Sequence, residues 1–161
     1  MSDFDLVSAV KEVTIITPDS YDADTTPAAL DTLNWRSATI LTNVGIGGIT
    51  FSTTNKVEFK LTHSDDDSTY TAVESTDVIM PFGETLGADG IIRSLIAAKA
   101  AADTASHKVG YIGKKRYLKL LADFSGTHGT ATPMAATLLL GHPLHAPGDQ
   151  GNYDDSHAIS F

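Results

Sequence analysis

The stretch that decides the fold is Lys56-Val57-Glu58-Phe59-Lys60-Leu61-Thr62, followed by Ser64-Asp65-Asp66-Asp67-Ser68 and then Tyr70-Thr71-Ala72-Val73. Every second residue from Val57 to Leu61 is apolar, and polar residues lie between them. This period of two predicts a strand with one buried face and one wet face. The acidic run is typical of a turn, and β character returns after it. The stretch therefore predicts a β-hairpin.

Several other segments share this short, β-branched or apolar character and are bounded by Gly, Pro or Asp. They are residues 7–16, 35–44, 77–80, 108–112, 116–124 and 134–140. Two packed antiparallel sheets are the economical way to bury so many half-apolar strands. The chain is therefore predicted to be mostly β, an antiparallel β-sandwich of the jelly-roll kind.

Two segments depart from the β pattern. Residues 18–34 are rich in Asp and Pro, which predicts a long acidic loop with a short turn of helix near residues 28–30. Residues 88–103 are rich in Ala, Ile and Leu, which predicts one short helix inserted between strands, with Asp89 as its N-cap.

The length of 161 residues is that of one domain. The sandwich domain is expected to span residues 1–147, with 1–34 partly an N-terminal arm or loop. Residues 143–161 are rich in Pro, Gly and Asp and lack a core pattern, so 148–161 are expected to form an extended C-terminal arm. The two ends are apolar at Phe4 to Leu6 and at Ile159 to Phe161, which suggests that they dock on a neighbour.

The charge excludes some partners. Twenty acidic residues face eleven basic ones, for a formal net charge of −9, and such a surface repels nucleic acid and anionic membranes. The only dense basic cluster, Lys114-Lys115-Arg116, follows Gly113 and is predicted to decorate a hairpin turn. No stretch approaches the ~20 apolar residues that span a bilayer. The acidic N-terminus lacks a signal-peptide pattern, so synthesis in a cytoplasm is expected.

No pattern of catalytic or metal-binding residues stands out. Ser8 and Lys11 have the spacing of a serine acyl-enzyme but face opposite sides of a predicted strand. The acidic run 65–67 lacks the ligand spacing of a calcium loop. A proline between His142 and His145 argues against a helical zinc pair, and the chain has no cysteine. The sequence predicts no enzyme, no cofactor and no metal.

Three segments together resemble a known group of proteins. They are His63 to Val73, Val109 to Leu118 and Leu139 to Pro147. This series resembles the capsid decoration, or cement, proteins of tailed bacteriophages. The resemblance covers about the second two-thirds of the chain, and residues 1–35 and those after Pro147 fall outside it.

The resemblance implies a trimeric jelly-roll protein that clamps the outer surface of an icosahedral shell. Its partner would be the major capsid protein, and its location the virion, after synthesis in the host bacterial cytoplasm. It implies no catalytic residue. We expect segments 1–34 and 143–161 to do the clamping, and the partner-binding candidates are Phe4, Leu6, Lys114, Lys115, Arg116, Ile159 and Phe161.

Other classes remain open. A head-tail connector or tail component would form rings of six or twelve copies. A carbohydrate-binding sandwich would need exposed aromatic platforms, for which the candidates are Trp35, Tyr21, Tyr70, Tyr111 and Tyr153. Trp35 begins an apolar strand and is expected in the core.

Overall fold

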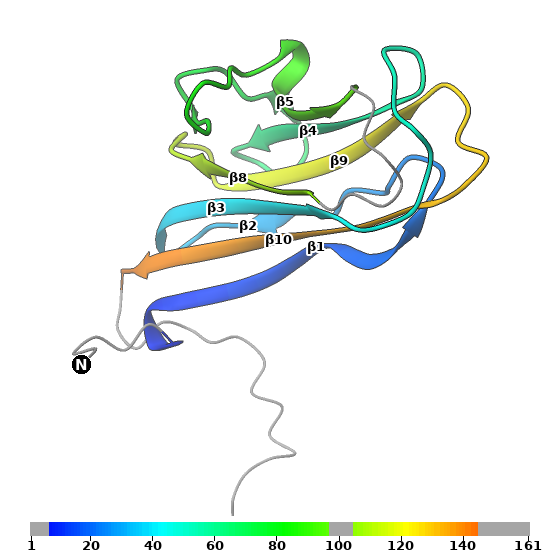
Figure 1. The fold of residues 1–161 in the computed structure, drawn as a ribbon. Helices are drawn as coiled ribbons and strands as arrows, with labels where there is room; N and C mark the ends of the chain where they lie inside the picture. Colours follow the sequence, from blue (N-terminus) through cyan, green and yellow to red (C-terminus); the bar gives the residue numbers. More distant parts are fainter. Residues whose placement is uncertain (1–6, 97–104, 145–161) are drawn as a thin grey trace, which may run out of the picture.

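The computed structural model describes residues 7–96 and 105–144. Over these residues the chain forms ten β-strands and two short 3-10 turns, η1 (Val7–Ala9) and η2 (Ala88–Gly90) (Figure 1). The predicted C-terminal arm, 148–161, and the first six residues of the predicted N-terminal segment 1–34 lie outside the described residues. No helix in the described part of the chain is long and apolar enough to cross a membrane.

The strands form two sheets. The first, which we call the β10 sheet, has the order β1-β10-β3-β8-β6. The second, the β4 sheet, has the order β2-β9-β4-β5, and β7 also pairs with β4. The strands are β1 (Val10–Tyr21), β2 (Leu30–Asp31), β3 (Trp35–Val44), β4 (Lys56–Ser64), β5 (Thr71–Ala72), β6 (Val78–Ile79), β7 (Ile91–Leu95), β8 (Ala105–Tyr111), β9 (Tyr117–Ser125) and β10 (Thr132–Pro143).

The strand pairs are nested about the middle of the chain. β1 pairs with β10, β2 with β9, β3 with β8 and β4 with β7, all antiparallel. The chain is therefore one long hairpin rolled into two sheets, which is the topology of a jelly roll. This confirms the predicted fold class.

The core lies between the two sheets and is built by alternation along each strand. In β10 every second residue from Thr132 to Leu140 is buried, and in β9 Leu118, Leu120 and Ala122 are fully buried. Val57, Phe59 and Leu61 of β4 are fully buried as well. The alternating pattern that predicted β4 therefore points its apolar face into the sandwich.

The two outer faces differ in charge along their central strands. On the β4 sheet the outward positions carry ion pairs, Lys56 with Glu58 and Lys60 with Asp123. On the β10 sheet the positions of β3 and β10 that alternate with buried ones carry no charged residue. These uncharged outward residues are Ser37, Thr39, Leu41, Asn43, Pro133, Ala135, Thr137, Leu139 and Gly141.

The predicted helix over 88–103 is wrong where the structure describes it. Only Ala88–Gly90 is helical, as a 3-10 turn, and Ile91–Leu95 is strand β7. Asp89 lies inside the turn at φ +55 and is not an N-cap. The edge of β4 takes Ile91 to Leu95 as a partner strand, and this pairing outweighs the helical propensity of the segment. Residues 97–103 lie outside the described part.

The loop predicted over 18–34 is partly strand. β1 continues to Tyr21, and Leu30–Asp31 is strand β2 instead of a helical turn. Leu30 pairs with Leu118 of β9, so it becomes the buried edge of the β4 sheet. The pairing partner lies 88 positions away in the sequence, which is why local pattern alone does not reveal it.

Candidate functional site

One end of the sandwich carries the attachment points of both terminal segments. The start of β1 pairs with the end of β10, through Val10 and Gly141. The Leu144 N–H donates a hydrogen bond of 2.8 Å to the Asn34 carbonyl. Val7 and Leu144, the first and last described residues, therefore both lie at this end, which Figure 1 shows where β1 begins and β10 ends. We call it the terminal end.

The terminal end gathers exposed apolar side chains. Val7, Leu33, Ile112 and Leu144 are between 48% and 76% exposed. Leu33 precedes Asn34, the residue that Leu144 contacts, and Ile112 lines a small hollow of about 160 Å³ together with Trp35. Apolar side chains gathered at one end of a chain with a net charge of −9 are typical of a contact surface.

The loop after β8 is held in place by Tyr111. The Tyr111 hydroxyl lies 3.0 Å from Nδ1 of His63, and it accepts the Lys115 N–H at 3.2 Å. The N–H groups of Ile112 and Gly113 both donate to the Asp77 carbonyl. These bonds fix the start of the loop, so Ile112 has a defined position.

Burial sets the protonation of this network. Tyr111 and His63 are both 6% exposed. Burial raises the pKa of Tyr111 to about 12. Burial, followed by the nearby Lys115 charge, lowers the pKa of His63 below its ordinary value. Both groups are therefore neutral near pH 7, and their hydrogen bond fits a structural role.

The basic tract does not present three free cations. Arg116 makes a two-point ion pair with Asp31, with Nε to Oδ1 at 2.8 Å and Nη2 to Oδ2 at 2.6 Å, and this bond lowers the pKa of Asp31. Lys115 Nζ donates to Thr71 Oγ1 at 2.8 Å. Among the described residues only Lys114 of the tract is without a partner. It is exposed and adjoins Ile112 across one residue.

The sequence predicts that the tract decorates a hairpin turn, and this prediction is wrong. It joins β8 of the β10 sheet to β9 of the β4 sheet, so it crosses between sheets. The Arg116 carbonyl accepts from Thr32 N–H and from the Thr32 hydroxyl. This ties the crossing to the segment before β3 and keeps the tract at the terminal end.

The acidic run after β4 closes a loop. The Asp66 carboxylate accepts hydrogen bonds from the N–H groups of Ser68 and Thr69 and from the Ser64 hydroxyl. These bonds hold the pKa of Asp66 well below its usual range. The loop joins β4 to β5, which pair, so the predicted hairpin is confirmed.

The described histidines have separate surroundings. His142 Nδ1 lies 3.0 Å from the Ser37 hydroxyl, His107 Nε2 lies 2.7 Å from Glu84, and His128 Nε2 donates to the Ser125 carbonyl. Over residues 7–96 and 105–144 no three His, Asp or Glu side chains gather as metal ligands would. His145 and His157 lie outside the described residues.

The aromatic candidates for glycan binding are engaged within the molecule. Tyr111 is buried, and Tyr21 and Trp35 pack against the core. The Lys119 ammonium lies 3.9 Å from the centroid of the Tyr70 ring. Tyr153 lies outside the described part. Trp35 is only partly buried: it packs against the core and also lines the hollow beside Ile112, so it is not the core residue that the sequence predicted.

The predicted contact residues fall into two groups. Lys114, Lys115 and Arg116 lie at the terminal end, whereas Phe4, Leu6, Ile159 and Phe161 lie outside the described residues. Sequence reasoning missed Leu33 and Ile112, because a single apolar residue next to a strand does not reveal its exposure. No family model matches the chain, and no curated protein is significantly similar to it.

Proposed function

We propose that this protein is a decoration protein of a tailed-phage capsid, bound to the outer shell surface through its terminal end. The observation that carries the proposal is the gathering there of four exposed apolar side chains with the attachment points of both terminal segments. The resemblance of three segments to decoration proteins supplies the partner, the major capsid protein. The protein acts on the virion and catalyses nothing.

The proposed mechanism is mechanical. Each copy covers a joint between major capsid subunits after the shell has expanded. An interface of standard size buries ~1,600 Å² and holds a complex without chemistry. A trimer repeats the contact three times, so modest single contacts add up to tight binding.

The exposed side chain of Ile112 gives a sharp test. Ile112→Glu puts a charge into the proposed contact, and because Ile112 is 57% exposed the change leaves the fold intact. Binding to expanded shells, measured by co-sedimentation, should weaken at least ~10-fold. Ile96→Glu is the matched control, since Ile96 is 42% exposed and follows β7 at the opposite end of the sandwich. Equal binding by wild type and Ile112→Glu would overturn the assignment of the terminal end.

Removal of residues 148–161 tests the segment itself. The truncated chain keeps every described strand, so its thermal unfolding should match that of the full chain. Its shell binding should fall. A truncated protein that binds expanded shells as tightly as the full chain would show that this segment does not clamp.

A further inference from the structure

The fully exposed Phe82 is the most prominent apolar side chain of the described surface. It is 108% exposed, so no part of its ring packs on its own chain. Ile79, close by on edge strand β6, is 59% exposed. Exposed large apolar groups of this kind mark sites of protein contact.

The turn that carries Phe82 is rigid. Glu84 N–H donates to the Pro81 carbonyl at 3.0 Å, and Gly83 takes φ +84, a conformation that suits glycine in such a turn. The Glu84 carboxylate lies 2.7 Å from Nε2 of His107, which ties the turn to β8. The ring is therefore presented on a preorganised knob, which lowers the entropic cost of docking it.

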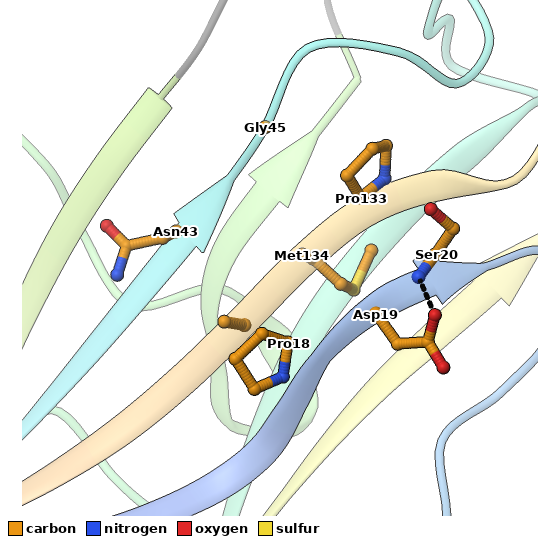
Figure 2. Close-up of a pocket in the computed structure, with 8 residues that line it drawn as sticks. Pro18, Asp19, Ser20, Asn43, Gly45, Pro133 and Met134 are labelled. Atoms are coloured by element: carbon orange, nitrogen blue, oxygen red, sulfur yellow. Dashed lines mark hydrogen bonds between the residues drawn. The ribbon is translucent and has the colours of Figure 1, made fainter.

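A hollow that fits an apolar knob lies on the outer face of the β10 sheet. It has a volume of about 400 Å³ and is lined by residues of β1, β10 and the end of β3. Figure 2 shows the rings of Pro18 and Pro133 with Met134 between them in this view, and Asp19 at the side of the hollow. The rest of the face over β3 and β10 is uncharged, as described above.

The knob and the hollow cannot meet within one chain. Phe82 follows β6, whereas Ala135 of the hollow is in β10, and β8 and β3 lie between these strands. At ~4.8 Å per strand the separation is at least ~14 Å. We propose that Phe82 of one copy docks in the Pro18–Pro133 hollow of a second copy of this chain.

Charge supports a second copy as the occupant. Lys108 is exposed on β8. It lies two residues from Gly110, which pairs with Ile79 of edge strand β6. Lys108 is therefore on the same edge of the sheet as the Phe82 turn. Asp19 is exposed beside the hollow. Docking the knob edge on the hollow of the next copy brings Lys108 toward Asp19. Over β3 and β10 the face between them carries no charged side chain that would oppose the contact of two chains with a net charge of −9.

The size of the face is sufficient. Four strands ~4.8 Å apart and about 33 Å long present on the order of 600 Å² of flat area. This approaches the ~800 Å² that one partner of a standard interface buries. Because knob and hollow lie at different places, the contact is head-to-tail, and a head-to-tail contact forms a ring when its rotation closes. Together with the proposed function, the inference is a ring of three members.

The first arm of the test is the mass in solution by light scattering. The wild-type chain should have the mass of three copies. The association constant of the Phe82→Ser variant should be roughly 30-fold lower, so that this variant dissociates at concentrations where the wild type is trimeric. Ile112→Ser, which changes an exposed side chain of similar size at the terminal end, should stay trimeric. A monomeric wild type, or equal loss in both variants, would overturn the inference.

The second arm uses the absence of cysteine from the chain. Phe82→Cys combined with Ala135→Cys should form disulfides between copies, giving covalent trimers under oxidising conditions. Neither single variant should form a covalent trimer. Failure of the double variant to cross-link while the wild type is trimeric would place the contact elsewhere. This inference deepens the proposed function, and because the assays contain no shells its failure is distinct from failure of shell binding.

Discussion

Tyr111 lies at the end of β8, where the chain crosses from the β10 sheet to the β4 sheet. Its hydroxyl connects β8 to two other segments. It contacts His63 on β4 and Lys115 in the loop that leads to β9. Gly113 is required beside it, because a Cβ at that position would lie 2.5 Å from the Tyr111 hydroxyl oxygen. A buried polar network of this kind specifies one loop conformation when every member is satisfied. The position of Ile112 at the terminal end depends on it.

Tyr111→Phe should destabilise the fold by about 1–3 kcal/mol, because it leaves the buried Nδ1 of His63 without its partner. Denaturant-induced unfolding measures the change. Tyr70→Phe is the control: its hydroxyl bonds to Asp67 in an exposed loop, and its loss should cost less than ~1 kcal/mol. Equal destabilisation by the two variants would show that the Tyr111 hydroxyl does not organise the loop.

His63 should make stability depend on pH. Burial lowers its pKa in the folded protein from the ordinary 6.5, so below that pH the unfolded chain binds a proton that the folded protein does not. The free energy of unfolding should therefore fall as pH drops below about 6.5, by at most ~1.4 kcal/mol per pH unit. His63→Gln should flatten the profile between about pH 7 and 5. Parallel profiles for the two proteins would contradict this.

At the scale of elements, β7 is the longer of two strands that sequence reasoning missed, the other being β2. Gly90, with φ +73, turns the chain into β7, and its position allows no side chain, since a Cβ would lie 2.4 Å from the Leu61 carbonyl oxygen. Arg93 of β7 is buried and crosses the sandwich to β3, where its Nη1 donates to the Thr42 carbonyl and hydroxyl. Burial lowers the pKa of Arg93 to about 10.

Gly90→Ala should destabilise the fold by more than ~2 kcal/mol, since strain at positive φ adds to the clash with Leu61. Gly83→Ala has a similar φ of +84 but nothing within 4 Å, so it should cost only about 1 kcal/mol. Thermal unfolding of both in a Phe82→Ser background separates the two contributions. If the two variants lose a similar free energy of unfolding, backbone strain alone accounts for the effect of Gly90→Ala, and the clash with Leu61 does not contribute.

Substitution of the two partners in the Arg93–Thr42 contact should lower the free energy of unfolding by different amounts. Thr42→Val removes an acceptor and leaves the buried guanidinium less well bonded, at a cost of about 1–3 kcal/mol. Arg93→Met replaces the charge by an apolar chain of similar length and should cost less, as often holds for buried charges. Chemical denaturation of both variants and of the double variant tests this. A loss on Arg93→Met that exceeds the loss on Thr42→Val would contradict it.

How much the sequence reveals differs among elements for physical reasons. Residues 35–44 are predicted as a strand and are β3, because the run is rich in apolar and β-branched residues and glycines follow it. Residues 88–103 carry Ala and Leu and were predicted as a helix, since propensity is local while pairing with β4 is not. The candidate site was only partly predictable. The basic tract is visible in the sequence, whereas its pairing with Asp31 and the exposure of Leu33 arise from contacts across the fold.

At the scale of the whole molecule, the nested strand pairing brings Val7 and Leu144, the first and last described residues, to one end of the sandwich. The proposed shell contact at the terminal end and the proposed contact between copies on the β10 sheet use different surfaces. One molecule can therefore make both contacts at once, and a ring of copies can present several terminal ends to a shell.

The measurement that tests the account most directly is the mass of the purified protein by light scattering, alone and after mixing with expanded shells of the phage proposed as its source. The account predicts a trimer that binds the shells and saturates at a fixed, high number of copies per shell. A ring of six or twelve copies that ignores the shell faces would contradict it and point instead to a connector or tail component.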